Sequence, residues 1–242
     1  MSGCTLCPRM CGADREHGEV GFCGMPAEIY AARAALHFWE EPPISGEKGS
    51  GAVFFSGCSL GCGFCQNTEI SQGKFGKAIS TQRLREIFGE LMDQGAHNIN
   101  LVTPTHFLPQ ILPALEPKLP VPVVYNCGGY ERVETLRMLE GKVDIYLPDL
   151  KFAEPELAKQ LCGAADYFPV AARAIDEMLR QVGRPVYGED GMLKKGVIIR
   201  HLVLPGQVQN SLKVLDYIAD HFPRGSVLVS LMAQFVPSGR LK

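Results

Sequence analysis

The feature that most constrains the fold is an alternation, repeated after residue 51, of a short apolar run and a longer segment with helical periodicity. In the clearest helical segment, STQRLREIFGELMDQG at residues 80–95, apolar residues recur three and four positions apart. Such an alternation predicts βαβ units and a parallel sheet. The apolar runs, interpreted as strands, are AVFFS (52–56), NINLVT (98–103), VPVVYN (121–126), VDIYLP (143–148), VIIRHLVL (197–204) and VLVSLM (227–232).

Right-handed crossovers would curl six such units either into part of a barrel or into an open doubly wound sheet. Six units are too few for a closed eight-fold barrel. We therefore expect an α/β fold, a partial (β/α)6 TIM-like barrel, with a flavodoxin-like open sheet as the alternative. The chain divides into an irregular, cysteine-rich N-terminal segment, residues 1–51, and a core domain, residues 52–242.

Composition and charge argue against several classes of protein. Hydrophobic residues make up 46% and charged residues 21%, as in an ordinary soluble domain, and the net charge of −2 gives no general reason to bind nucleic acid or an anionic membrane. No apolar stretch is long enough to span a bilayer. The first residues, MSGCTLCPRMCGADRE, lack the apolar core of a signal peptide. We expect a cytoplasmic protein that binds neither nucleic acid nor membrane.

Three of the nine cysteines, Cys58, Cys62 and Cys65, share the loop SGCSLGCGFCQN that follows the first predicted strand. Clustered cysteines in a cytoplasmic chain indicate metal rather than disulfides. A cubic 4Fe–4S cluster is normally held by four thiolates, so three would leave one iron open to a substrate or cofactor. The alternatives are a zinc knuckle completed by Cys127 or His106, and three reduced, buried cysteines.

A second group of cysteines occupies the first 23 residues and offers a complete set of four thiols. Such a set suits a closed metal site, either zinc or a second cluster. The two isolated cysteines, Cys127 and Cys162, are expected to be small buried apolar residues. The four thiols of the possible second metal site are Cys4, Cys7, Cys11 and Cys23.

Polar residues mark the ends of the predicted strands, where parallel α/β sheets place their chemistry. Asp149 and Lys151 are two positions apart, so in an extended chain they point the same way. Arg200 interrupts an apolar strand, where a charge is costly without a partner. Thr103 and Asn126 end two other strands. We expect these residues to meet around one buried polar pocket.

The loop CSLGCGFC, with an aromatic residue just before its last cysteine, resembles the signature of radical S-adenosylmethionine (SAM) enzymes. FFSGCSLGCGFCQNTEISQG, YLPDLKF and IIRHLVLPG together resemble the pyruvate formate-lyase activating enzyme branch, and the likeness extends over about residues 52–236. It implies a six-stranded partial barrel and a 4Fe–4S cluster on Cys58, Cys62 and Cys65 whose open iron binds SAM. Relatives usually continue into further helical sequence beyond the FVPSGRLK at which this chain stops.

The resemblance also implies an activity. An electron from the reduced cluster, supplied by a donor such as flavodoxin or ferredoxin, would cleave SAM to methionine and a 5′-deoxyadenosyl radical. In this branch the radical abstracts hydrogen from a glycine of a partner protein, a glycyl-radical enzyme. A radical SAM enzyme acting on a small molecule or peptide is one alternative, and a non-enzymatic zinc-binding or electron-transfer protein is another.

The resemblance further implies which side chains contact SAM, and no catalytic residue beyond the cluster ligands is assigned. Most such enzymes carry Gly-Gly-Glu after the second strand to receive the amino group of SAM, whereas this chain has VTPTH there. Hydroxyls or carbonyls of Thr103 and Thr105 would take that role. The expected cofactor-binding residues are Thr103, Asn126, Asp149, Lys151 and Arg200.

Overall fold

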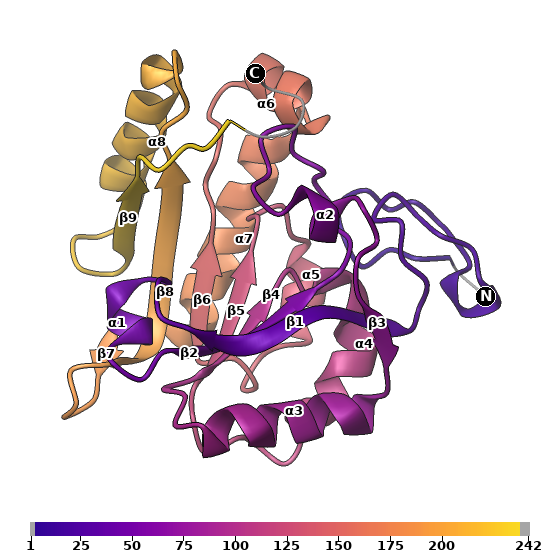
Figure 1. The fold of residues 1–242 in the computed structure, drawn as a ribbon. Helices are drawn as coiled ribbons and strands as arrows, with labels where there is room; N and C mark the ends of the chain where they lie inside the picture. The colour runs from indigo at the N-terminus through magenta and orange to yellow at the C-terminus, as the bar shows by residue number, and fades with distance from the viewer. Residues whose placement is uncertain (1–2, 238–242) are drawn as a thin grey trace.

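The computed structural model describes residues 3–237, and its centre is a mixed sheet. Within the described residues the strands are β1 Ile29–His37, β2 Ser50–Phe55, β3 Lys77–Ile79, β4 Ile99–Val102, β5 Val123–Cys127, β6 Ile145–Pro148, β7 Val186–Tyr187, β8 Leu193–Leu202 and β9 Leu228–Met232. The arrowheads of β6, β8 and β9 point toward the end of the sheet that lies nearest to helix α2, Thr68–Ser71 (Figure 1).

Six of these strands, β2, β4, β5, β6, β8 and β9, correspond to the six predicted ones, and each pairs in parallel with the next. Their order follows the chain without the reversal that a doubly wound sheet requires, which excludes the flavodoxin-like alternative. The sheet is not closed. The expectation of an α/β fold with a parallel core is therefore confirmed, whereas its finer form, a partial TIM-like barrel, is not confirmed.

The prediction that residues 1–51 are irregular throughout was wrong for residues 29–37. These form β1, which pairs antiparallel with both β2 and β3 and bulges between Ala31 and Arg33. The sequence IYAARAALH is rich in alanine and has no polar–apolar alternation, so nothing local favours a strand. Pairing with the backbone of β2 overrides that weak preference.

The helices follow the predicted segments, with shorter ones added in the loops. Helix α3 begins after Ser80, whose hydroxyl accepts a hydrogen bond from the Arg83 N–H at 3.0 Å. The segment LPQILPALE (108–116), which also has a helical pattern of apolar residues, is broken at Pro113, which has no N–H to donate, into a short α-helix and a 3-10 turn, Leu112–Leu115. The α-helices not yet given are α1 Pro42–Ser45, α3 Thr81–Asp93, α4 Leu108–Ile111, α5 Val133–Arg137, α6 Pro155–Cys162, α7 Tyr167–Val182 and α8 Val208–His221.

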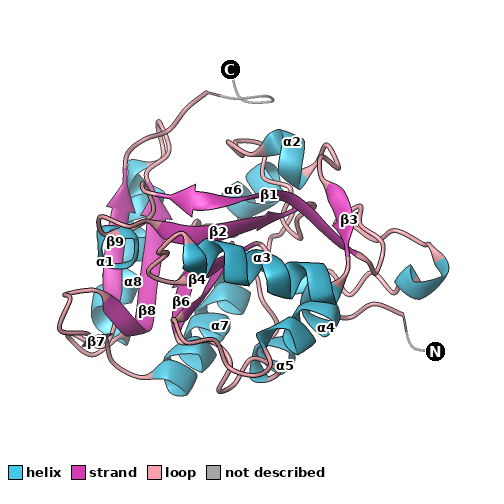
Figure 2. Cartoon of the chain, turned by 60° about the horizontal axis from the view of Figure 1, so that its bottom comes forward, coloured by secondary structure: helices cyan, strands magenta, loops and turns pink. Residues whose placement is uncertain are grey.

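The helical layer buries the apolar face of the sheet. Helices α3, α4, α5 and α7 group on one side of the strands (Figure 2), with α3 in contact with β1, β2 and β4 and α7 in contact with β6 and β8. The predicted periodicity of α3 is confirmed, because Leu84, Ile87, Phe88 and Leu91 are buried. Among residues 3–237, none of the helices combines the length and the apolar character needed to cross a membrane.

Candidate functional site

An open pocket of about 560 Å³ lies where the parallel strands end, a volume in the range of small-molecule sites. Its walls come from strand ends that are distant in sequence, together with the loop after β2. The structure brings all the residues predicted for the cluster and the cofactor to this one place. The predicted residues that line the pocket are Cys58, Cys62, Cys65, Thr103, Asn126, Asp149, Lys151 and Arg200.

The three-cysteine loop connects β2 to α2 and is packed tightly at its start. Gly57 has φ +83°, and a Cβ there would lie 2.7 Å from the carbonyl oxygen of Cys23, so only glycine fits. Two thiol sulfurs of the loop accept hydrogen bonds, Cys58 Sγ from the Leu60 N–H and Cys65 Sγ from the Ser71 hydroxyl, both at 3.4 Å. Hydrogen-bond donors thus point at the sulfurs of Cys58 and Cys65, and such donors favour the thiolate form that a metal requires.

The pKa values of two of the loop thiols, Cys58 and Cys62, are raised. Burial, together with the nearby Cys62, raises the pKa of Cys58 to about 11. A hydrogen bond with Cys162, followed by burial, raises the pKa of Cys62 well above its ordinary value, while the Lys151 ammonium acts in the opposite direction. Because metals bind thiolates, assembly of a metal centre here would release the protons of these thiols.

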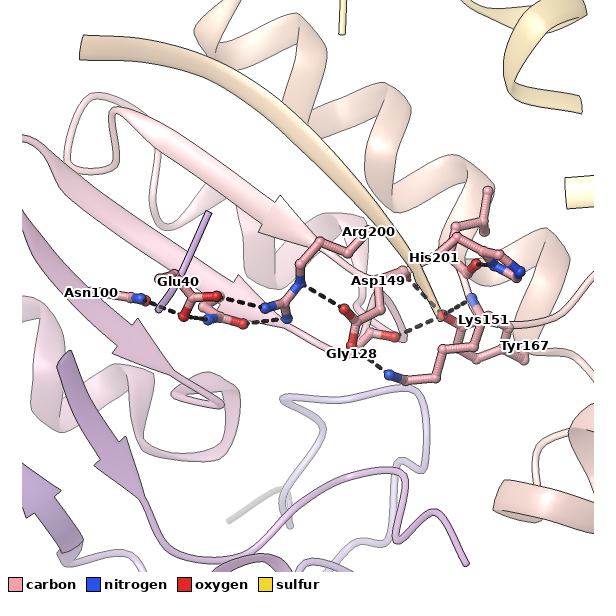
Figure 3. A network of polar contacts seen from close by, with 10 residues as sticks. Glu40, Asn100, Gly128, Asp149, Lys151, Tyr167, Arg200 and His201 are labelled. Carbon is pink, nitrogen blue, oxygen red and sulfur yellow. Dashed lines mark hydrogen bonds and ion pairs between the residues drawn. The ribbon is translucent and has the colours of Figure 1, made fainter. Parts of the chain in front are cut away.

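A network of charges lines the same pocket, and Arg200 is its centre (Figure 3). Its Nε donates to Asp149 Oδ1 at 2.9 Å, its Nη1 to Glu40 Oε1 at 3.0 Å and its Nη2 to Asn126 Oδ1 at 2.7 Å. The side chains of Arg200 and Asp149 are each 14% exposed and that of Glu40 is 11% exposed. The partner that Arg200 needs is therefore supplied within the chain, by two carboxylates and an amide.

Lys151 extends this network toward the cysteines. Its Nζ donates to Asp149 Oδ2, and the Asp149 carboxylate, followed by Cys62, keeps the pKa of Lys151 above its ordinary value despite burial. Burial would raise the pKa of Asp149, but Arg200 and Lys151 outweigh it and leave that pKa below its ordinary value. All three side chains are therefore charged at neutral pH, and Lys151 presents a fixed positive charge beside Cys62.

Glu40 is a functional residue that the sequence did not single out. It lies just after β1, and its Oε2 accepts hydrogen bonds from Asn100 at 3.1 Å and from Asn126 at 3.0 Å. Its partners thus lie on three different strands, β4, β5 and β8. No periodicity or motif in HFWEEPP indicates such a role, because every partner is distant in sequence.

Thr103 lies at the end of β4 with φ +58°, a left-handed conformation that is unfavourable for a β-branched residue. Its N–H donates to the carbonyl of Asn126 at 2.8 Å, which helps to hold that conformation. Backbone strain of this kind gathers at binding sites. The residue predicted to replace the missing Gly-Gly-Glu is thus held in a special backbone geometry on the pocket wall.

His106 is not among the residues that line the pocket. It is buried, its Nε2 lies 2.6 Å from the Ser56 carbonyl oxygen, and burial lowers its pKa to about 4. Across residues 3–237, no group of three or more His, Cys, Asp or Glu side chains is arranged to hold a single metal ion. The alternative of a zinc knuckle completed by Cys127 or His106 therefore finds no support. A cubic cluster differs, because each thiolate binds a separate iron and the sulfurs stand farther apart.

The four N-terminal cysteines lie outside the pocket, and they neighbour one another. Cys11 and Cys4 share a hydrogen bond, and Cys23 lies close enough to both for an electrostatic interaction. Three of these sulfurs accept a hydrogen bond from the backbone N–H two residues further on: Cys7 from Arg9, Cys11 from Ala13 and Cys23 from Met25.

The two isolated cysteines are buried, as predicted. Cys127 also lines the pocket, and Cys162 contacts Cys62, which the prediction of small apolar residues missed. A buried cysteine gives no sequence signal of which thiol it will meet.

Two sequence comparisons bear on this site. Residues 44–108, which contain the three-cysteine loop, match the family model described as a 4Fe-4S single cluster domain. The uncharacterized protein MJ0674 of Methanocaldococcus jannaschii is 32% identical over 253 residues, an alignment that covers 100% of this chain and 68% of that protein.

Several solved structures share the fold at low sequence identity. Streptococcus suis SuiB is 16% identical with a TM-score of 0.50, covering 76% of this chain and 40% of SuiB. SuiB bound to its precursor peptide SuiA, also 16% identical, has a TM-score of 0.52 and covers 76% of this chain and 39% of that one. Methylornithine synthase (PylB) is 15% identical with a TM-score of 0.50, covering 76% and 56%. The chain thus spans between 39% and 56% of these proteins, and the likeness concerns the fold.

Proposed function

Because the chain belongs to the same family as MJ0674 of Methanocaldococcus jannaschii and matches a 4Fe-4S single cluster domain across its three-cysteine loop, we propose that it is a radical SAM enzyme. It binds a 4Fe–4S cluster through Cys58, Cys62 and Cys65, and SAM in the adjoining pocket. The observation that carries the proposal is that these three thiols share one pocket with Asp149, Lys151 and the other predicted cofactor residues.

The side chains present fit the cluster. Three thiols line one wall, and the loop supplies no fourth, which leaves one iron of a cubic cluster for an external ligand. When bound, the reduced cluster supplies the single electron that cleaves SAM to methionine and a 5′-deoxyadenosyl radical. The role of the loop is to hold the three sulfurs in the pocket that Lys151 and Asp149 also line.

The charges of the Arg200 network and of Lys151 suit the methionyl end of SAM, which carries one carboxylate and one amino group. Lys151 is positive, lies beside Cys62 and attracts the carboxylate. Arg200 is engaged through all three of its nitrogens, so its role is to hold Asp149 and Asn126 in place and to offer its remaining N–H groups. Thr103 would receive the amino group through its hydroxyl or carbonyl oxygen.

The substrate we propose is a protein or peptide, and in the form implied by the sequence resemblance it is a partner glycyl-radical enzyme that loses a hydrogen atom from a glycine. The similarity in fold to SuiB, which was solved with a precursor peptide, favours this class. The pocket also has apolar contacts to offer at its rim, since Trp39 is 90% exposed and Leu231 is 55% exposed, and both line it. Flavodoxin or ferredoxin would supply the electron in the cytoplasm.

The test is anaerobic reconstitution with iron and sulfide, followed by electron paramagnetic resonance (EPR) of the reduced protein with and without SAM. The proposal predicts a 4Fe–4S signal that SAM shifts, together with release of 5′-deoxyadenosine and methionine. A signal that SAM leaves unchanged would instead indicate an electron-transfer protein. The matched control is Cys127→Ser, which alters a pocket-lining thiol outside the loop and should keep the signal.

The second part of the proposal concerns the substrate and is tested separately. Incubation of the active enzyme with SAM, reductant and a glycyl-radical enzyme should produce a glycyl radical signal on the partner. Cleavage of SAM without such a signal would favour a peptide or small molecule instead. The first experiment would then stand while the second fails.

The N-terminal quartet is proposed as a second metal site of the same chain. Its support is the pattern of backbone N–H groups directed at Cys7, Cys11 and Cys23. Because these side chains are not arranged around a single ion, we favour a second 4Fe–4S cluster over zinc. Reconstituted protein should then contain about eight iron atoms per chain, and about four if only the loop binds a cluster.

A further inference from the structure

One side chain of the N-terminal segment, Arg9, donates hydrogen bonds to the three-cysteine loop, and it lies between Cys7 and Cys11 in the sequence. Its Nε donates to the carbonyl oxygen of Ser59 at 2.8 Å, and its Nη2 approaches that of Leu60 at 3.4 Å. Both carbonyls belong to the short stretch between Cys58 and Cys62. The guanidinium is therefore hydrogen-bonded to the part of the loop that sets the distance between Cys58 and Cys62, two of the proposed cluster ligands.

The same guanidinium also binds the end of α6. Its Nη2 donates to the carbonyl oxygen of Cys162 at 2.7 Å and its Nη1 to that of Gly163 at 2.6 Å. The last carbonyls of a helix have no partner within the helix and attract a cation. Arg9 satisfies two of them while it holds the loop, so the loop and the helix end are tied to each other through a single planar group.

The position of Arg9 is itself restrained. Its guanidinium carbon lies 4.0 Å from the ring centre of Phe22 and 5.3 Å from that of Tyr130, and Tyr130 is fixed by its hydroxyl, which donates to Asp166 Oδ1 at 2.7 Å. The Arg9 backbone N–H donates to the sulfur of Cys7. Contacts with two aromatic rings and with a thiol therefore orient Arg9 before any cluster is present.

A second contact joins the loop to the same helix. The N–H of Gly63, between Cys62 and Cys65, donates to the carbonyl oxygen of Leu161 at 2.9 Å. The segment from Ser59 to Gly63 thus lies against the end of α6 at both of its ends, and one of the two attachments is supplied by the N-terminal segment. Loops that carry metal ligands need such support, because the partners behind the ligands set their geometry.

We propose that Arg9 is the positioning residue of the three-cysteine loop, and that the N-terminal cysteine-rich segment acts on the radical site by holding Arg9. Arg9 does not line the pocket, and its hydrogen bonds to the loop go to the carbonyls of Ser59 and Leu60, so its effect passes through the loop backbone. Lysine cannot replace it, because the single ammonium group of lysine cannot reach all four carbonyls that the planar guanidinium of Arg9 contacts. The inference rests on the proposed function only where it concerns the cluster.

The first test uses the full chain without a cluster. Hydrogen exchange followed by mass spectrometry should show that residues 57–66, which include the hydrogen-bonded Gly63 amide, exchange at least tenfold faster in Arg9→Ala, and faster in Arg9→Lys, than in the wild type. The matched control is Arg85→Ala, because Arg85 also bridges two carbonyls, those of Ala114 at 2.9 Å and Pro117 at 2.8 Å, at a site remote from the loop. Unchanged exchange in both Arg9 variants would overturn the proposal.

The second test uses the reconstituted protein. Arg9→Ala should shift the midpoint potential of the cluster and shorten its lifetime in air severalfold, whereas Arg85→Ala should change neither. If the wild type takes up no cluster, the proposed function fails while the exchange experiment still decides the role of Arg9. Should Arg9→Ala fail to fold, Arg9→Lys and Phe22→Leu, which removes one stacking ring, serve for both measurements, and wild-type values in both would overturn the proposal.

Discussion

The thiol of Cys162, at the end of α6, lies in hydrogen-bond contact with the thiol of Cys62 in the three-cysteine loop. A fourth thiol therefore stands next to a ligand of the proposed cluster, although it does not line the pocket. The Cys162 thiol also donates to the carbonyl oxygen of Ala158, one turn earlier in α6, at 3.0 Å. We interpret Cys162 as a neighbour of the cluster and not as its fourth ligand.

The first prediction separates these two thiols. Cys62→Ala should lose the cluster and reduce SAM cleavage by roughly 100-fold or more, because it removes an iron ligand. Cys162→Ala should keep the iron content of the wild type and the EPR shift on addition of SAM. Iron analysis and EPR of both variants, reconstituted side by side, provide the measurement. Loss of the cluster in Cys162→Ala would show that four thiolates, and not three, hold it.

The second prediction concerns Lys151, the pocket-lining cation whose charge acts on Cys62. Lys151→Met should raise the KM for SAM by about 10- to 100-fold, since one charge-assisted hydrogen bond contributes about 1.5–3 kcal/mol. The rate of 5′-deoxyadenosine formation against SAM concentration gives the KM. Lys213→Met removes an exposed lysine paired with Glu154 and should leave the KM unchanged. Equal KM values for all three proteins would remove Lys151 from the binding site.

The third prediction tests the buried charge network. Arg200→Ala leaves Glu40 and Asp149 without their shared cation, and the free energy of unfolding should fall by about 3–5 kcal/mol. Arg83→Ala removes exposed ion pairs to Glu86 and Glu90 and should cost less than about 1 kcal/mol. Urea unfolding of the two cluster-free variants and the wild type measures both values. A small loss in Arg200→Ala would mean that water replaces the missing guanidinium.

The fourth prediction is a pH dependence that originates from Glu131, outside the pocket. Burial raises the pKa of Glu131 to about 7, although Thr105 and Tyr125 donate hydrogen bonds to its carboxylate at 2.9 and 3.2 Å. A carboxyl with a raised pKa binds more protons in the folded than in the unfolded chain between its ordinary pKa of 4.5 and about 7. This contribution to stability is present below pH 4.5 and is lost as the pH rises through 7.

Glu131→Gln should abolish that pH dependence. From pH 4.5 to pH 8 the free energy of unfolding of the wild type should fall by on the order of 3 kcal/mol relative to the variant. Urea unfolding of the cluster-free proteins at several pH values within this window supplies the comparison. Parallel curves for the two proteins would show that Glu131 is ionised in the folded chain throughout.

Much of the fold could be predicted because it follows from local patterns in the sequence. The six parallel strands were predicted from short apolar runs, and helix α3 was predicted from apolar periodicity, since burial on one face of a helix imposes a spacing that the sequence displays. The same holds for the three-cysteine loop, whose ligands are neighbours in the chain. Polar residues at strand ends were predicted to meet because carboxyl ends of parallel strands share one edge of the sheet.

Only the tertiary structure decided the contacts between segments that show no local sequence pattern. Strand β1 forms because β2 and β3 offer it a backbone edge, and Glu40 finds Arg200 across 160 positions of sequence. Arg9 reaches the end of α6 across 153 positions. The physical reason is that periodicity records which side of an element is buried, whereas the partner of a charged or thiol side chain depends on how distant elements pack. The sequence by itself thus determined the strands and the three-thiol motif, and packing determined which side chains support that motif.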